Sequence, residues 1–242
     1  MTSTVDRPAF YAVGTGTGGL RDWVTLLHPP YTAWHLSYVA IGATLAPHFV
    51  AWKLGGTLLA FLLAVGVGAH ALDELNGRPL QTGISSRALV VTGAVGVGVP
   101  VVVGWMYGGL RLVPFIVVGA LLVVGYNLEL AGGRLHNAVV FAVAWGAFPV
   151  VVGYYAQDFR LEAPAFVAAG AAFFLSLAQR ALSAPVRDLR RRAEAAHGQV
   201  AFRDGTRVHL DREGLIAPLE AALRASSAGL ALLAVALVAT RW

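Results

Sequence analysis

Three polar side chains close an apolar stretch in the segment GAHALDELNGRPLQTG, residues 68–83. His70, Asp73 and Glu74 have the spacing i, i+3 and i+4, so a helix would place them on one face. This pattern predicts either a proton-transfer pair or a Mg²⁺ site in which Asp73 and Glu74 share the ion with substrate phosphate oxygens. Arg78 follows and would pair with an anionic group. The alternative is an interfacial loop whose acidic pair is satisfied internally.

A second polar cluster lies in YNLELAGGRLHN, residues 126–137. Asn127 and Glu129 end one apolar segment, and Arg134 and His136 begin the next. We expect Glu129 and His136 to complete a catalytic site, one of them as a proton acceptor, and Asn127 and Arg134 to bind substrate. The alternative is helix capping together with an arginine that marks the cytoplasmic side.

The third cluster is SLAQRALSAPVRDLRRR, residues 176–192. Gln179, Arg180 and Arg187 are the expected substrate contacts, because a guanidinium fork binds phosphate oxygens through paired hydrogen bonds. The alternative for the arginine run 190–192 is contact with anionic lipid. His35, inside the first apolar segment, is either functional or a hydrogen-bonding contact between helices.

A glycine-rich stretch, GTGTGG, comes before the first apolar segment. Gly14, Gly16 and Gly19 match the dinucleotide-binding pattern G-x-G-x-x-G, which requires a preceding strand and a βαβ unit. Neither is visible, so the pattern favours a flexible entry loop.

Composition indicates where these clusters must be held. The 242 residues are 57% hydrophobic and 13% charged, whereas soluble domains carry about 25% charged residues. The sequence therefore predicts an integral membrane protein. Because there is no cysteine, disulfides and thiolate sites are excluded. The net charge of +5 is interpreted as topology signals and lipid contacts, not nucleic-acid binding. We expect no cleavable signal peptide.

Apolar runs predict an all-α, polytopic transmembrane bundle of about seven helices. The seven segments are residues 31–50, 54–72, 88–110, 112–128, 135–157, 163–179 and 225–240. The expected units are an N-terminal cytoplasmic segment (1–30), a transmembrane core (31–182), a cytoplasmic insertion (183–224) and a last transmembrane helix (225–242). The insertion is expected to hold a basic helix ending at Gly198 and a small hairpin that turns at Asp204 and Gly205.

Orientation follows from the distribution of cationic residues. With the N-terminus in the cytoplasm, fourteen arginines fall on that side, and only Lys53, Arg111, Arg160 and Arg241 fall on the other. The positive-inside rule therefore predicts a cytoplasmic N-terminus and an external C-terminus in the cell inner membrane. The three polar clusters then share the cytoplasmic face.

Together these motifs resemble the UbiA superfamily of intramembrane prenyltransferases. Family members carry N-D-x-x-D-x-x-x-D after helix two, followed by R-P-L and G-I-S. Here HALDELNGRPLQTGIS occupies that place, YNLELAGGRLHN is similar to the segment joining helices four and five, and the resemblance covers residues 27–190. The chain departs from the pattern because His70 and Glu74 occupy the D-x-x-x-D spacing. Asp188 is the only acid where the second acidic motif belongs, and the family usually has more than seven helices.

The resemblance implies a UbiA-like fold, Mg²⁺ as cofactor, and transfer or cyclisation of a polyprenyl diphosphate at a cytoplasm-facing site. Arginines would stabilise the diphosphate leaving group where acids are missing. Two alternatives remain open. One is a non-catalytic UbiA-like subunit that binds lipid or a quinone within a larger membrane complex. The other is a membrane enzyme whose transition metal is held by residues of these clusters and by His35.

Overall fold

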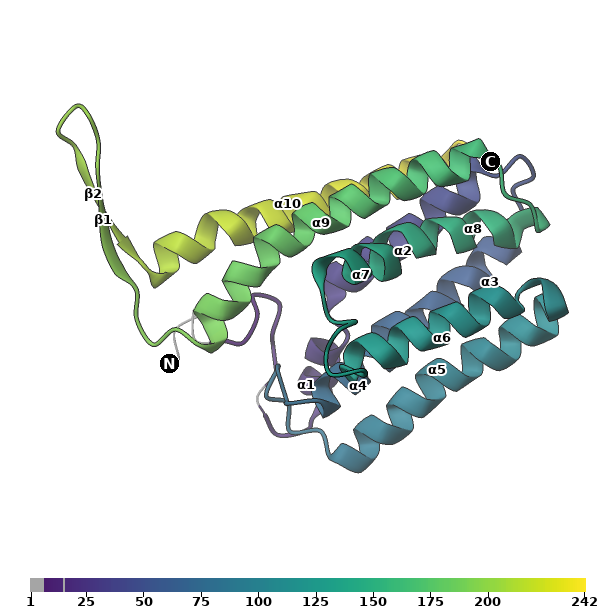
Figure 1. The fold of residues 1–242 in the computed structure, drawn as a ribbon, viewed down its shortest axis with the longest axis horizontal. Helices are drawn as coiled ribbons and strands as arrows, with labels where there is room; N and C mark the ends of the chain where they lie inside the picture. The colour runs from purple at the N-terminus through teal and green to yellow at the C-terminus, as the bar shows by residue number, and fades with distance from the viewer. Residues whose placement is uncertain (1–6, 15) are drawn as a thin grey trace.

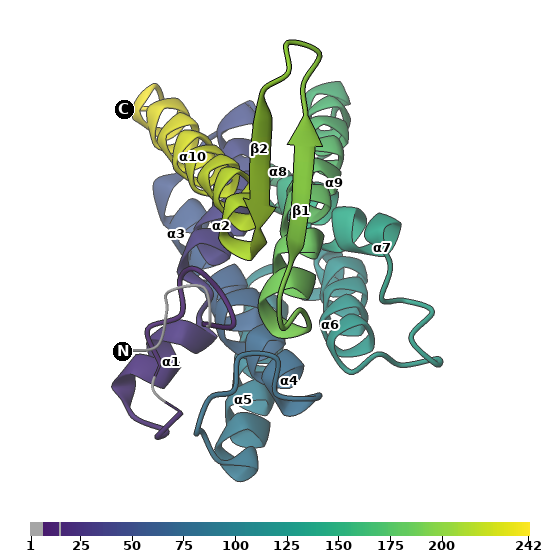
Figure 2. The ribbon, with the colours of Figure 1, turned by 90° about the vertical axis from the view of Figure 1, so that its left-hand side faces the viewer.

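The computed structural model describes residues 7–14 and 16–242, which form a mostly helical bundle with one projecting hairpin (Figures 1 and 2). In chain order, the elements are α1 (Leu20–Leu26), α2 (Pro29–Leu45), α3 (Ala51–Phe61), a π-helical stretch (Leu62–Ala69), α4 (His70–Leu75), α5 (Ser86–Gly108), a 3₁₀ turn (Gly109–Arg111), α6 (Val113–Asn127), α7 (Ala138–Ala142), a π-helical stretch (Val143–Ala147), α8 (Phe148–Asp158), α9 (Ala163–Arg191), β1 (His197–Ala201), β2 (Arg207–Asp211) and α10 (Arg212–Ala239).

Five helices in the described residues are long and apolar enough to cross a membrane. They are Ala51–Leu75, Ser86–Arg111, Ala138–Asp158, Ala163–Arg191 and Arg212–Ala239. This confirms the prediction of an all-α membrane protein, because each span satisfies its backbone hydrogen bonds internally. Two further helices, α2 with 17 residues and α6 with 15 residues, are shorter. The expected count of seven membrane-crossing helices therefore stays a prediction.

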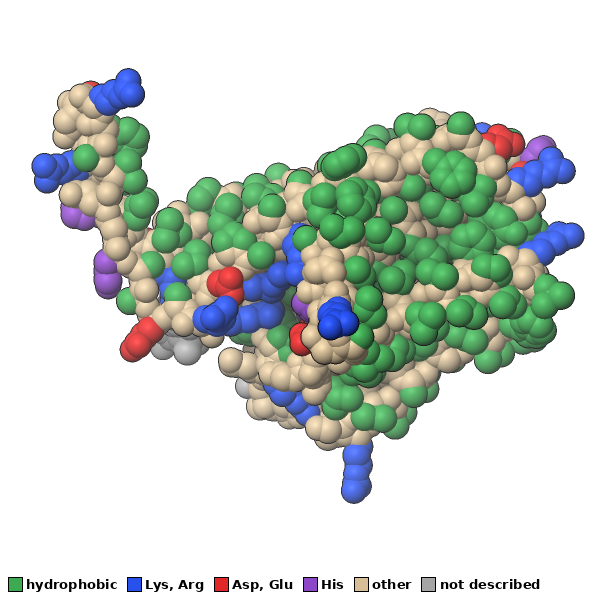
Figure 3. All heavy atoms as spheres, in the orientation of Figure 1, with side chains coloured by type: hydrophobic (Ala, Val, Ile, Leu, Met, Phe, Trp, Pro, Cys, Tyr) green, Lys and Arg blue, Asp and Glu red, His purple; other side chains and the backbone are tan. Residues whose placement is uncertain are grey.

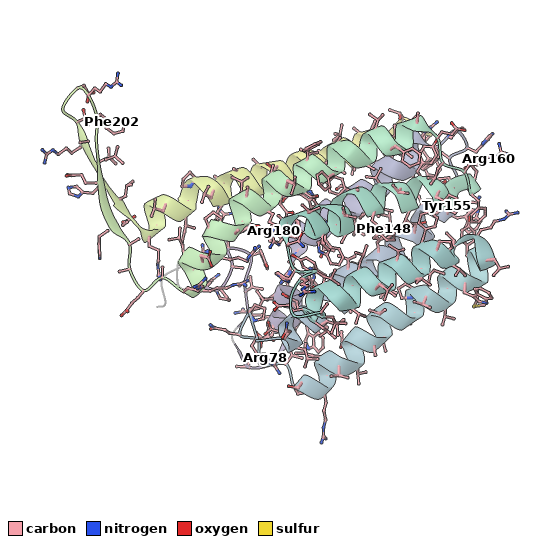
Figure 4. All side chains as sticks on the ribbon, in the orientation of Figure 1. Arg78, Phe148, Tyr155, Arg160, Arg180 and Phe202 are labelled. Atoms are coloured by element: carbon pink, nitrogen blue, oxygen red, sulfur yellow. The ribbon has the colours of Figure 1, made fainter. Side chains whose placement is uncertain are left out.

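The cationic residues separate between the two ends of the bundle as the sequence predicted. Lys53 and Arg111 both lie over the ring of Phe159, and Arg241 donates to the Thr44 and Ala46 carbonyls beside the same end. Arg160 lies at this end in Figure 4, far from Arg78 and Arg180 at the other. The helix flanks between the two ends are largely covered by hydrophobic side chains (Figure 3). This distribution suits a bilayer-spanning bundle.

The centre of the bundle is a close crossing of α2 and α8. A Cβ added at Gly42 would collide with the Val150 carbonyl, and one added at Gly153 would collide with the Val39 carbonyl. The two backbones can therefore approach only because small residues lie at the crossing, as is common between helices in lipid.

We expect Gly42→Ala to lower the free energy of unfolding by about 1–3 kcal/mol, because the overpacked crossing must open. Gly55→Ala on α3 is the matched control, since a Cβ there meets nothing within 4 Å. Thermal unfolding of both variants in the same detergent measures the difference. Equal melting temperatures would show that the crossing is not tightly packed.

The insertion differs in detail from its prediction. Helix α9 runs directly from the membrane span to Arg191, and α10 begins at Arg212, so no separate basic helix extends to Gly198 and the last span begins before residue 225. Asp211 caps α10 by accepting from the Gly214 amide, a signal that an apolar-run criterion does not detect. Strands β1 and β2 pair antiparallel, with Val200 opposite Val208.

The glycine-rich entry loop is held by one buried carboxylate. Asp22 is fully buried, and it accepts from the backbone amides of Gly16, Gly18 and Gly83. The Asp22 carboxylate thus occupies backbone amides of the glycine-rich loop, the kind of group that would bind the phosphates in a dinucleotide site. The loop is anchored against residues 81–84 instead of forming the flexible entry that the sequence favoured.

Candidate functional site

A polar cavity of about 270 Å³ lies at the hairpin end of the bundle, between α2, α4, α6 and α9. Cationic, acidic and histidine side chains gather at this end in Figure 3. Eight of the predicted site residues line the cavity: His70, Asp73, Asn127, Glu129, His136, Gln179, Arg180 and Arg187. Three others, Glu74, Arg78 and Arg134, are not among its lining residues.

Helix α9 supplies the cationic wall. Arg180 donates to the Tyr126 hydroxyl over 2.6 Å, and Arg187 donates to the Ser183 hydroxyl over 3.1 Å. Arg191 also lines the cavity, and its Nε donates to the Pro8 carbonyl over 3.3 Å. These arginines follow one face of the helix, which directs several guanidinium groups toward one space. Such a wall suits a ligand with more than one negative charge.

Asp73 and Glu74 have different surroundings although they are neighbours. Glu74 is fully buried and accepts from the Leu80 amide, the Thr82 amide and the Thr82 hydroxyl, each over 2.8 Å. Asp73 lines the cavity, and its carboxylate makes no hydrogen bond or ion pair with any residue that the structure describes. Adjacent helical residues point in different directions, so only Asp73 remains available to a ligand.

Arg78 braces the loop that follows α4. It adopts a left-handed backbone conformation, with φ of 54°. Its guanidinium donates to the carbonyls of Thr82 and Ile84 and to the Ser86 hydroxyl. Its donors are therefore directed at the chain itself and not at the cavity. Arg134 is exposed to solvent.

The residues after α6 form the mouth of the cavity. The His136 ring stacks on Tyr126 at 4.4 Å between centroids, and its Nδ1 lies 3.7 Å from a Glu129 carboxylate oxygen. The Glu129 side chain is half-exposed. Asn127 is buried and donates to the Val123 carbonyl over 2.7 Å. Asp73 and Glu129 thus line one cavity, as the clustering of the motifs predicted.

Sequence reasoning missed His28, which lies just before α2. Its ring lies against that of His70, with centroids 3.9 Å apart and the ring planes tilted by 49°, and its Nε2 is buried without a hydrogen-bond partner among the described residues. Burial lowers the pKa of His28 well below its usual range, and the nearby His70 and Arg191 act in the same direction. His28 is therefore neutral at pH 7.

Other residues lining the cavity were also missed or left undecided. Tyr11, from the N-terminal segment, lines it, and burial raises the pKa of Tyr11 well above its usual range. His35 lines the cavity and hydrogen-bonds through Nδ1 to the Trp145 carbonyl over 2.8 Å. This is the contact between helices that the sequence offered as one alternative, and a functional role for His35 stays a prediction. Arg191 was recognisable as the next turn of the Arg187 face.

A second cavity, of about 220 Å³, is apolar and lies between the 51–75 helix, α5, α6 and α8. Phe61, Phe115 and Phe148 are among its lining residues, and Figure 4 labels Phe148, which begins α8. Val65 and Trp145 line both cavities. The polar and apolar spaces therefore adjoin, as a ligand with a charged head and a hydrocarbon tail would require.

Within residues 7–14 and 16–242, no group of three or more His, Asp or Glu side chains is arranged to hold a metal ion. Comparison with protein-family models, with curated proteins and with solved structures gives no match for this chain.

Proposed function

We propose that this chain is a UbiA-like intramembrane enzyme that transfers or cyclises the prenyl group of a polyprenyl diphosphate. The observation that carries the proposal is that an arginine-lined polar cavity and an apolar cavity share two lining residues, Val65 and Trp145. A diphosphate in the first space and an isoprenoid tail in the second would satisfy both.

The side chains of the polar cavity divide naturally into roles. Arg180, Arg187 and Arg191 would bind the diphosphate and stabilise the charge that develops as it leaves. Asp73 would be the protein ligand of a Mg²⁺ ion, which proteins commonly hold by one or two carboxylates plus phosphate oxygens. That ion would neutralise the leaving group. The Glu74 oxygens already accept three hydrogen bonds from the loop, so Glu74 does not fit this role.

Binding of farnesyl diphosphate to the purified protein in nanodiscs tests the proposal. We expect tighter binding than for inorganic diphosphate or farnesol alone, because each fills only one of the two cavities. Arg187→Gln should weaken binding of farnesyl diphosphate about 10–100-fold, the equivalent of one lost charged hydrogen bond. Arg203→Gln in the exposed hairpin turn is the control. Equal affinity of both variants for farnesyl diphosphate would show that the arginines of α9 do not bind the diphosphate.

The proposed topology has the N-terminus and the hairpin in the cytoplasm and the C-terminus outside the inner membrane. Because the chain has no cysteine, single cysteines can be introduced at Thr206 in the hairpin turn and at His48 near the other end. We expect a membrane-impermeant thiol reagent to label His48→Cys on intact cells and Thr206→Cys only after lysis. The reverse pattern would invert the assignment.

A second candidate is a non-catalytic subunit that binds lipid or a quinone within a larger complex. It is favoured by the single unpaired carboxylate in the interior of the cavity and by the hairpin, where Val200, Phe202 and Val208 are exposed. Such a protein would bind a quinone at an affinity that Arg187→Gln leaves unchanged, and it would release no diphosphate from farnesyl diphosphate. The transition-metal alternative has no supporting ligand group among the described residues.

A further inference from the structure

We propose that His28 is the proton acceptor of the polar cavity, receiving through Nε2 the proton that a prenyl-transfer or elimination reaction releases. The inference rests on the proposed function, and it assigns the proton to a residue outside the three polar motifs of the sequence. Four observations carry it: the position of the ring, its unsatisfied nitrogen, its backbone conformation and its neighbours.

The unsatisfied nitrogen is the first indication. His28 is 9% exposed, and its Nε2 is wholly buried with no partner among the described residues. A buried polar atom without a hydrogen bond is destabilising. His28 lines the cavity, so a ligand that displaces the packing around Nε2 would reach this nitrogen and satisfy it.

The backbone supports the same conclusion. His28 has φ of 45° and ψ of 57°, a left-handed conformation that non-glycine residues rarely adopt. As the residue preceding α2 it could cap that helix, yet its side chain makes no capping hydrogen bond. The strained conformation instead directs the ring into the cavity. Strain of this kind is concentrated at functional sites.

The neighbours keep the ring neutral and in position. The ring of His70 in α4 packs against it in a tilted arrangement with centroids 3.9 Å apart, and the ring of Tyr11 in the N-terminal segment lies 5.2 Å away between centroids. The charged groups that act on it are Arg187 and Arg191 of α9, while His35 of α2 is also near. These positive groups disfavour an imidazolium, so the resting ring has a free lone pair.

The chemistry balances by two routes, of which elimination needs no additional reactant. The C1–O bond of the prenyl diphosphate breaks, and the electron pair leaves with the diphosphate. A nucleophile's electron pair forms the new bond to C1, and its displaced proton passes to Nε2. Without a nucleophile, a C–H bond beside the cation supplies the pair for a new C=C bond, and the same nitrogen takes the proton. A weak base suffices, because a proton beside a carbocation is strongly acidic.

Elimination therefore gives a test that needs no second substrate. Farnesyl diphosphate is incubated with the full-length protein and Mg²⁺ in nanodiscs, and released diphosphate, farnesene hydrocarbons and farnesol-type alcohols are measured. Alcohols arise by attack of water, which can lose its proton to solvent. The hydrocarbon share of the products therefore reports an internal proton acceptor.

We expect His28→Gly to lower the hydrocarbon share about tenfold or more, in line with loss of a general base, while total diphosphate release changes less than the share does. Glycine tolerates the left-handed backbone, and added imidazole should restore the share by occupying the vacated space. His28→Asn, which also tolerates this conformation, should lower the share without imidazole rescue. His48→Gly, at an exposed position, is the control.

The outcomes separate the two proposals. Three outcomes would overturn the role of His28 and leave the proposed function standing. The hydrocarbon share could be unchanged in His28→Gly, or both products could fall in parallel without imidazole rescue. The third outcome is that the wild-type protein forms alcohols alone. No diphosphate release from the wild-type protein would overturn the proposed enzymatic function and the role of His28 with it.

Discussion

Asp73→Asn is expected to weaken binding of farnesyl diphosphate in the presence of Mg²⁺ and to lower turnover, while the melting temperature stays the same or rises. The carboxylate lines the cavity without a hydrogen bond or ion pair among the described residues, so its charge is available to a ligand. The amide keeps the shape and removes that charge. If charge stabilisation resembles that of other oxyanion sites, the loss is about 2–4 kcal/mol in transition-state terms.

The expected effect of Asp73→Asn on the melting temperature follows from the same geometry. A half-buried carboxylate without a partner pays a desolvation cost that a neutral amide largely avoids. Thermal unfolding measures the stability of this variant, and titration with farnesyl diphosphate, with and without Mg²⁺, measures its binding. A lower melting temperature with unchanged binding would show that Asp73 serves the fold, and the enzyme proposal would lose the one carboxylate that the described residues place inside the cavity.

The architecture was predictable because it depends on properties that repeat along the chain. Long apolar runs must form helices in lipid, and they mark the five helices of the described residues that are long and apolar enough to cross a membrane. The division of cationic residues between the two ends of the bundle was also predictable. The residues assigned to one end flank apolar segments on the same side of the predicted membrane: Lys53, Arg111, Arg160 and Arg241. The Arg187 face of α9 was likewise visible from the spacing of its arginines.

The parts of the site that escaped prediction depend on how loops fold onto helices. Helical spacing placed Asp73 and Glu74 on one face, but only the fold shows that residues 80–82 cover one of them. Arg78 was assigned to an anionic ligand, yet its donors are used by three groups of its own loop. His28 escaped notice because it precedes two prolines outside any apolar run, where sequence periodicity carries no information.

Glu74→Gln is expected to have the opposite effect from the neighbouring Asp73→Asn. Three donors converge on the two Glu74 oxygens: the Leu80 amide on Oε2, and the Thr82 amide and hydroxyl on Oε1. A glutamine has one oxygen, so either orientation of its amide turns an N–H group toward a backbone donor. The carboxylate is fully buried, so water cannot replace the lost hydrogen bond.

We expect a loss of about 2–4 kcal/mol of stability, the usual range for breaking a charged hydrogen bond and leaving a buried donor unpaired. At about 2–4 °C per kcal/mol for a chain of this size, the melting temperature should fall by several degrees or more. Binding of farnesyl diphosphate, measured well below the melting temperature, should stay within about twofold of wild type, because Glu74 does not line the cavity. A twofold change is smaller than the effect of losing one charged hydrogen bond. If instead Glu74→Gln unfolds at the wild-type temperature and loses Mg²⁺-dependent binding, Glu74 is a ligand residue. Residues 80–82 would then have to move off Glu74 when the substrate binds, since their donors occupy both oxygens in the structure described.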